Sequence, residues 1–154
     1  MKSTKQALYW IVDILKKRRV PFQISGGLAA RIYGATRGLA DIDIDIREKN
    51  FKKLLPKVKN YIIFGPRRYK NKNWDAYLMT LCYCGQKIDI CGANEAKIFD
   101  KNRRIWTSYR TDFSISESKN VFGIKVSVIS KKDLVNYKRK LRRRVDLLDL
   151  KQIN

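Results

Sequence analysis

Histidine is absent from the 154-residue sequence, and cysteine and proline are scarce. Without histidine the chain can form no Ser-His-Asp triad, no Cys-His pair and no histidine general base. The three cysteines, Cys82, Cys84 and Cys91, are a poor zinc set on their own. We expect Cys82 and Cys84 to be reduced and to pack in a sheet. Any enzymatic chemistry must therefore rest on carboxylates or on metal ions.

Long apolar runs are also missing. None approaches the roughly 20 residues of a membrane-spanning helix, and Gln6, Asp13 and Lys16 interrupt the stretch where a signal peptide would be apolar. We therefore expect a cytoplasmic protein with no membrane partner. Apolar residues still make up 44% of the chain. That suffices for one domain over residues 1–154, with its core at 20–130 and C-terminal helices at 131–153.

Negative charge is in short supply. Only 14 acidic residues face 35 Lys and Arg, which gives a formal net charge of +21. Basic clusters occur at 16–19, 67–72, 101–104 and 138–144, and aromatic residues lie within or near them: Tyr69, Trp74, Trp106 and Tyr109. Cations beside aromatic rings suit phosphates and unstacked bases. We therefore expect a polyanionic partner such as RNA, with a solvated basic surface as the alternative.

The pattern of apolar residues predicts a mixed order of helices and strands. Helices are expected at 4–19, 28–33, 51–61, 95–100, 131–144 and 145–153. Strands are expected at 22–24, 41–46, 76–84 and 87–91, with a further hairpin within 113–129. Pro56 should kink or break its helix. This order favours an α+β or α/β domain.

The clearest local signal is the strand at 41–46, which reads Asp-Ile-Asp-Ile-Asp-Ile. A period of two places the isoleucines on one face and Asp41, Asp43 and Asp45 on the other. Carboxylates about 7 Å apart on one face repel one another, so a divalent cation is their natural partner. Oxygen ligands without His or Cys favour Mg²⁺ or Mn²⁺. An exposed sheet face with solvated carboxylates is the alternative.

Asp89 lies in a second alternating segment, Lys87-Ile88-Asp89-Ile90, and can join the first group from a neighbouring strand. Three carboxylates that hold two Mg²⁺ ions about 3.5–4 Å apart would serve an in-line phosphoryl or nucleotidyl transfer. One ion would lower the pKa of the acceptor hydroxyl, and the other would bind the triphosphate and the leaving pyrophosphate. A solvated or salt-bridged Asp89 is an equal alternative.

The segment Ser25-Gly26-Gly27 lies between an expected strand and an expected helix. Free backbone N–H groups at a helix N-terminus bind anions, and the glycines would let the backbone approach phosphates closely. An ordinary strand-to-helix turn has the same sequence. Arg37 lies between this turn and the acidic strand, so the two features together favour a phosphate-bearing ligand.

Together these segments resemble the nucleotidyltransferase (polymerase-β-like) superfamily. The resemblance is strongest to its lincosamide and aminoglycoside-2''-adenylyltransferase-like members and to the minimal nucleotidyltransferases. It rests on the segments 24–30, 33–34, 36–37 and 41–43, about a quarter of the chain. The family pattern is a Gly-Gly or Gly-Ser turn, a helix and an Asp-x-Asp strand, with Thr-Arg just before that strand in the antibiotic-modifying branch. The resemblance implies a mixed sheet with helices mainly on one face and the acids in a cleft on the other.

The resemblance also implies which residues form the site. The metal-binding and catalytic residues would be Asp41, Asp43 and Asp89, and Asp89 could also activate the acceptor hydroxyl. The nucleotide would be bound by Ser25, Gly26, Gly27, Arg37 and Lys138. Asp45 is extra to the family motif.

The resulting prediction is a Mg²⁺- or Mn²⁺-dependent enzyme that moves NMP from an NTP, expected to be ATP, to a hydroxyl of a tRNA-like RNA. The cationic surface argues against a cationic aminoglycoside as acceptor. Three alternatives stay open: a toxin–antitoxin-type enzyme that modifies a partner protein, an enzyme that modifies a small-molecule antibiotic, and a non-catalytic nucleic-acid-binding module. The chain would recognise its acceptor with its own surface, as a homodimer, or together with a small helical partner protein.

Overall fold

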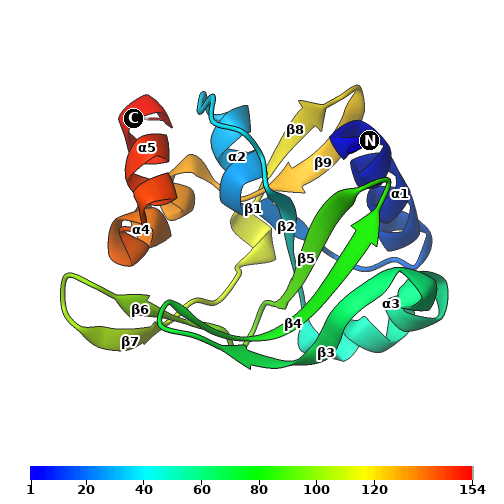
Figure 1. Ribbon diagram of the computed structural model, residues 1–154, viewed down its shortest axis with the longest axis horizontal. Coiled ribbons are helices and arrows are strands. Elements are labelled where there is room, and N and C mark those ends of the chain that lie inside the picture. The colour runs from blue at the N-terminus through cyan, green and yellow to red at the C-terminus, as the bar shows by residue number, and fades with distance from the viewer. Residues whose placement is uncertain (154) are drawn as a thin grey trace.

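Residues 1–153, which the computed structural model describes, form a mixed sheet with five α-helices around it (Figure 1). The helices are α1 (Thr4–Lys17), α2 (Gly26–Ile32), α3 (Phe51–Val58), α4 (Lys131–Leu141) and α5 (Arg144–Ile153). The strands are β1 (Gln23–Ser25), β2 (Asp41–Ile46), β3 (Ile62–Lys70), β4 (Trp74–Tyr83), β5 (Gln86–Gly92), β6 (Lys97–Asp100), β7 (Ile105–Ser108), β8 (Glu117–Val121) and β9 (Ile124–Val128).

The strand order is β7-β6-β4-β5-β2-β1-β9-β8, and β3 pairs with β4 beside this path. Two neighbouring pairs, β2 with β5 and β1 with β9, are parallel, and the others are antiparallel. The helices gather in two groups: α1 contacts α3, whereas α2 contacts α4 and α5 (Figure 1). The α+β class expected from the sequence is confirmed.

The apolar face of the central strands forms the core. Ile42, Ile44 and Ile46 of β2 are fully buried, as are Ile88 and Ile90 of the neighbouring β5. The apolar stripe of α1 belongs to the same core. Because side chains alternate along a strand, burial of these isoleucines turns the aspartates of both strands to the opposite face. The alternating sequence and the core together therefore place the carboxylates side by side.

The structure differs from the sequence predictions at several places, among them the unpredicted strand β7 at 105–108. Residues 62–70 form β3, which no pattern indicated because register shifts interrupt its pairing with β4 and most of its residues are not buried. The expected helix at 95–100 is wrong: β6 occupies its second half and pairs with β7 and with the start of β4. Pro56 lies inside α3, and this helix ends at Val58, so the helix expected at 51–61 is shorter than predicted. Cys84 is exposed beside the β4–β5 turn rather than packed in the sheet.

Within residues 1–153, none of the helices combines the length and the apolar character that a membrane crossing requires.

Candidate active site

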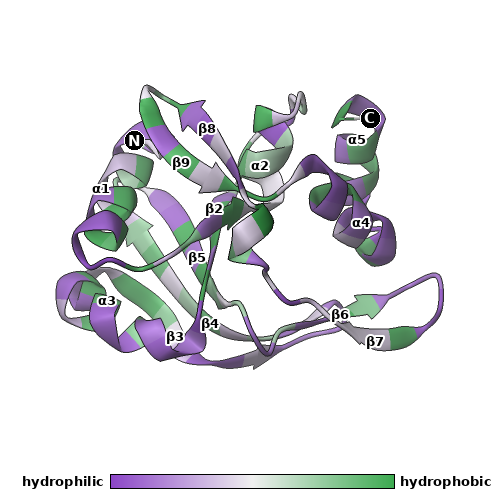
Figure 2. Ribbon diagram, turned by 180° about the vertical axis from the view of Figure 1, so that it is seen from behind, coloured by the Kyte–Doolittle hydropathy of each residue, from purple (hydrophilic) through white to green (hydrophobic). Residues whose placement is uncertain are grey.

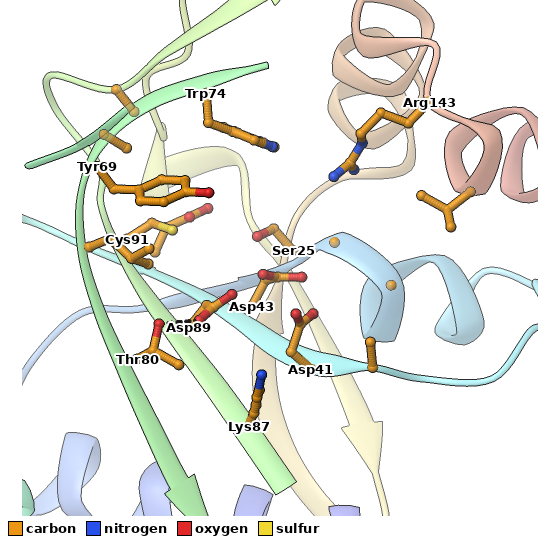
Figure 3. A pocket seen from close by; sticks show the side chains of 18 of the residues that line it. Ser25, Asp41, Asp43, Tyr69, Trp74, Thr80, Lys87, Asp89, Cys91 and Arg143 are labelled. Carbon is orange, nitrogen blue, oxygen red and sulfur yellow. Dashed lines mark hydrogen bonds between the residues drawn. The ribbon is translucent and has the colours of Figure 1, made fainter. Parts of the chain in front are cut away.

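Three carboxylates meet where β2 and β5 run side by side (Figure 3). The parallel register sets Asp43 opposite Asp89, and Asp41 lies two residues earlier on the same face of β2. Carboxylate oxygens of Asp41, Asp43 and Asp89 all lie within 4.8 Å of one another. The structure thus brings together the three acids that the sequence and its family resemblance singled out.

Crowding of these groups makes their joint ionisation costly. Burial, followed by the charges of Asp41 and Asp89, raises the pKa of Asp43 well above its ordinary value. Burial also raises the pKa of Asp89, although a hydrogen bond of 2.6 Å from the Thr80 hydroxyl to Asp89 Oδ1 opposes the rise. The Asp43 and Asp89 carboxylates would ionise more readily beside a cation. An oxygen-only donor set with this proximity and repulsion fits Mg²⁺ or Mn²⁺.

A glycine turn lies directly against these three carboxylates. Ser25, the last residue of β1, pairs with Asp43 of β2, so the turn that follows lies over the central carboxylate. Gly26 has φ +60°, and a Cβ there would lie 1.9 Å from Asp43 Oδ2. The N–H of Gly26 donates to the Tyr137 hydroxyl over 2.8 Å. This amide is therefore not free for a phosphate, contrary to the expectation for the turn.

We expect Gly26→Ala to lower both stability and any transfer activity. The left-handed backbone alone costs about 1–2 kcal/mol for an L side chain, and the added methyl must push Asp43 aside. Thermal unfolding and transfer assays measure the two effects. Gly38→Ala is the matched control, because nothing lies within 4 Å of a Cβ built there. Equal effects of the two substitutions would contradict a special role for Gly26.

Two arginines lie beside the turn. Arg37 comes from the loop before β2, and Arg143 comes from the C-terminal half of the chain. Arg37 makes a bidentate ion pair with Asp149 of α5, with N···O distances of 2.7 and 2.9 Å. Arg143, at the α4–α5 junction, pairs in the same way with Asp146 over 2.8 and 3.0 Å. Both line the pocket that holds the carboxylates. The close-up shows Arg143 extending from the helices toward the side of the pocket where Trp74 and Asp43 lie (Figure 3).

The role expected for Lys138 is wrong. The family resemblance implied that it reaches the phosphates of the nucleotide, but its side chain is fully buried and does not line the pocket. Its ammonium lies 3.1 Å from Asp146 and 2.9 Å from Asp149. Lys138 therefore neutralises the two carboxylates that hold Arg37 and Arg143, and it does not contact a ligand in the pocket.

The pocket has a volume of about 470 Å³ and joins all these features. Its polar wall consists of the carboxylates, the glycine turn and the two arginines. Aromatic side chains also line the pocket: Phe64, Tyr69, Trp74, Tyr109 and Tyr137. Such a mixture of apolar surface and a few convergent polar groups is typical of a small-molecule site.

The solved structures that match this chain share one fold. A protein of Thermotoga maritima, provisionally named a nucleotidyltransferase (TM1012), has a TM-score of 0.75 at 20% identity and covers 98% of this chain and 93% of its own. The lincosamide antibiotic adenylyltransferase LnuA, bound to lincomycin, has a TM-score of 0.63 at 17% identity, with coverages of 98% and 96%. ANT(2'')-Ia in complex with adenylyl-2''-tobramycin has a TM-score of 0.51 at 17% identity, with coverages of 86% and 73%.

The chain has the nucleotidyltransferase fold. No protein-family model matches the sequence, and no curated protein matches it either. The likeness therefore lies in the three-dimensional arrangement, which the short motif at 24–43 had indicated.

Within this nucleotidyltransferase fold, several site residues escaped sequence reasoning. The sequence does not single out Arg143, because six of the seven residues at 138–144 are basic. The only local signal is Asp146 three residues later, at helical pairing distance. Thr80 and the aromatic side chains of the pocket come largely from β3 and β4. Their approach to the acids depends on sheet order, which a single sequence does not reveal.

Asp45 stands apart from the other acids of β2. It is buried and lines the pocket, but it is not part of the group of three. Burial raises its pKa to about 7, although hydrogen bonding to Thr111, Gln23 and Ser25 opposes the rise. Asp45 Oδ2 and the hydroxyl of Tyr109 have no hydrogen-bond partner within residues 1–153. Asp45 and Tyr109 both line the pocket, so its lining includes two buried polar atoms without a partner, which is unusual in a folded protein.

Proposed function

We propose that this chain is a divalent-metal-dependent nucleotidyltransferase. It moves NMP from an NTP, which we expect to be ATP, to a hydroxyl of an RNA acceptor. One observation carries the proposal. Asp41, Asp43 and Asp89 converge against the Gly26–Gly27 turn inside one pocket of about 470 Å³. The nucleotidyltransferase fold of the structural neighbours supports the same reaction class.

The three carboxylates would hold the metal, because they offer the close oxygen donors that Mg²⁺ or Mn²⁺ takes. When bound, a pair of such ions would lower the pKa of the acceptor hydroxyl and stabilise the charge of the triphosphate and the leaving pyrophosphate during in-line displacement. The residues of the chain would supply position. Asp43 would be the central ligand, because it lies between Ser25 on one neighbouring strand and Asp89 on the other.

Proton transfer and phosphate binding would fall to different sides of the pocket. The hydrogen bond from Thr80 fixes the Asp89 carboxylate, and Asp89 would accept the proton of the acceptor hydroxyl. The Gly27 backbone, Arg37 and Arg143 would bind the triphosphate, whereas the Ser25 hydroxyl already bonds to Asp45. Both arginines are already oriented by buried carboxylates. They would therefore lose little conformational freedom when a nucleotide binds.

The acceptor is assigned from charge. A formal net charge of +21 favours a polyanion such as RNA and disfavours a cationic aminoglycoside. A neutral small-molecule acceptor is the second candidate, because the matching structures include an adenylyltransferase with lincomycin bound. An RNA and a small molecule are far apart in size, so one labelling reaction separates them.

The test is incubation of the purified protein with each α-³²P-labelled NTP, Mg²⁺ or Mn²⁺, and total RNA. Parallel reactions contain lincomycin or tobramycin in place of RNA. We expect label from ATP in an RNA band, and no label when EDTA removes the metal. Label on an antibiotic or on a protein would replace the RNA acceptor while keeping the transfer reaction. Absence of label from every NTP and acceptor would overturn the proposal.

A further inference from the structure

Three basic segments, which we call the cationic rim, lie at one end of the molecule (Figure 1). They are residues 67–72 at the end of β3, residues 101–104 in the β6–β7 turn, and residues 139–144 at the α4–α5 junction. Together they contain twelve Lys and Arg, about a third of the total, and no Asp or Glu. In the hydropathy view α4 and the β6–β7 turn are strongly hydrophilic (Figure 2).

Contacts between the segments make the rim continuous. The N–H of Lys101 donates to the carbonyl of Lys140 over 2.9 Å, and Arg142 donates to the Asn102 side chain over 2.9 Å. These bonds join the β6–β7 turn to the end of α4. On the other side, the Lys70 ammonium lies 5.1 Å from the centre of the Trp106 ring. This contact joins the β3–β4 hairpin to β7.

Most cations of the rim have no counter-charge within residues 1–153. Arg68 pairs with Asp75 and Arg143 with Asp146, and the other ten make no ion pair. Some other acids pair with bases outside the rim, as Asp13 does with Lys17. Ten unpaired cations on three adjoining segments repel one another. A polyanion would remove this repulsion and release its own counter-ions on binding.

The rim leads into the pocket and has aromatic rings within it or beside it. Tyr69 and Arg143 belong to both the rim and the pocket lining. Tyr69 is 37% exposed, and Trp106 is half-buried beside Phe99 and Lys70. Alternation of cations and aromatic faces is the pattern of single-stranded nucleic-acid binding, in which rings stack on unpaired bases. An acidic protein has no bases to stack, and a duplex offers none that are unpaired.

We infer that the cationic rim binds single-stranded RNA and directs its end into the acidic pocket. The inference rests on the proposed function for its purpose, but RNA binding itself is measurable without turnover. Phosphates would lie along the three basic segments. Trp106 would stack on a base outside the pocket.

The test is binding of a fluorescent single-stranded oligo(U) in EDTA without NTP, at several salt concentrations. The rim variant is Lys72→Glu/Lys101→Glu/Arg103→Glu, and none of these residues lines the pocket. The matched control is Lys52→Glu/Lys53→Glu/Lys57→Glu on α3, which is exposed and at the other end of the molecule (Figure 1). Both variants change the net charge equally.

We expect the rim variant to bind oligo(U) at least about tenfold more weakly, with a salt slope smaller by about 2 if three phosphate contacts are lost. The control should change affinity less than about threefold. Equal losses in both variants, or no loss in the rim variant, would overturn the inference.

A second arm tests stacking. Trp106→Leu keeps an apolar group against Phe99 and should weaken oligo(U) binding by about tenfold, but not binding of heparin, which has no bases. Unchanged oligo(U) binding would mean a rim that attracts any polyanion, acidic proteins included, and would exclude the assignment to RNA.

Failure of the two proposals is distinguishable. Asp43→Asn should bind oligo(U) at least as well as the natural chain although it transfers no nucleotide. If the rim variant still transfers nucleotide to RNA and binds oligo(U) with unchanged affinity, only the inference about the rim is overturned. Rim-dependent RNA binding without nucleotidyl transfer under any condition would overturn only the proposed enzymatic function.

Discussion

Asp43→Asn is expected to reduce nucleotidyl transfer by more than about a hundredfold while the fold persists, because even the outer partners of metal ligands are typically worth about 10–100-fold. Asparagine keeps the shape of the side chain and removes the central charge of the carboxylate group. Asp43 is flanked by Ser25 in the register of β1 and by Asp89 in the register of β5. Its loss therefore leaves two acids with no ligand between them. The rate of label transfer from α-³²P-labelled ATP measures the effect.

The same substitution should raise stability when metal is absent. Burial and the neighbouring acids raise the pKa of Asp43 in the folded state above its unfolded value. The folded state then binds more protons, so stability falls as pH rises from the unfolded pKa toward the folded pKa. The substituted amide does not ionise and so escapes this loss. In EDTA at neutral pH, Asp43→Asn should therefore unfold at a higher temperature than the natural chain, and the gap should narrow as the pH falls toward the unfolded pKa of aspartate.

Asp13→Asn is the control for both effects, since it removes the same charge from an exposed side chain of α1. It should leave transfer unchanged and shift the unfolding temperature little. Added Mg²⁺ should stabilise the natural chain and not the Asp43→Asn variant, because binding to the folded state alone shifts its stability. Normal transfer by a folded Asp43→Asn protein would contradict the proposed site.

The sequence predicts the acidic strand well because its signal is local. Alternation of Asp and Ile at 41–46 specifies a strand, its buried face and its polar face without reference to the rest of the chain. Asp89 is different. Its alternating segment predicts a strand, but its place opposite Asp43 depends on a parallel pairing between segments more than 40 residues apart in the chain. The alternating pattern allowed this placement beside an equal alternative, and the family resemblance favoured it.

The failed predictions have physical causes that a local sequence pattern does not show. Residues 62–70 pair irregularly, so the strand has no clean period, and the short segment at 97–100 is stabilised by its partners rather than by its own propensity. Lys138 and Arg143 lie in one basic stretch, where composition cannot tell a buried lysine from a pocket arginine. Helix phase decides between them: Lys138 lies on the buried face of α4, and Arg143 follows its end.

Lys138→Met is expected to lower the free energy of unfolding by about 3–5 kcal/mol, because it leaves buried carboxylates with less compensation. The Lys138 ammonium lies 3.1 Å from Asp146 and 2.9 Å from Asp149, and all three side chains are fully buried. Although burial raises the pKa of Asp146, hydrogen bonds from Arg143 and the charge of Lys138 hold it below its ordinary value. Asp146 therefore depends on the cation that the substitution removes, and Asp149 loses one of its two ion-pair partners.

Comparison with a surface pair separates this effect from loss of charge alone. Lys17→Met removes an exposed partner of Asp13 and should cost less than about 1 kcal/mol in denaturant unfolding. The double variant Lys138→Met/Asp149→Asn should be less destabilised than the sum of its single variants, because the second change removes a charge that the first left uncompensated. Additive losses would show that Lys138 does not neutralise Asp149. Weaker NTP binding by a folded Lys138 variant would then follow from movement of Arg37 and Arg143, since these two arginines, and not Lys138, line the pocket.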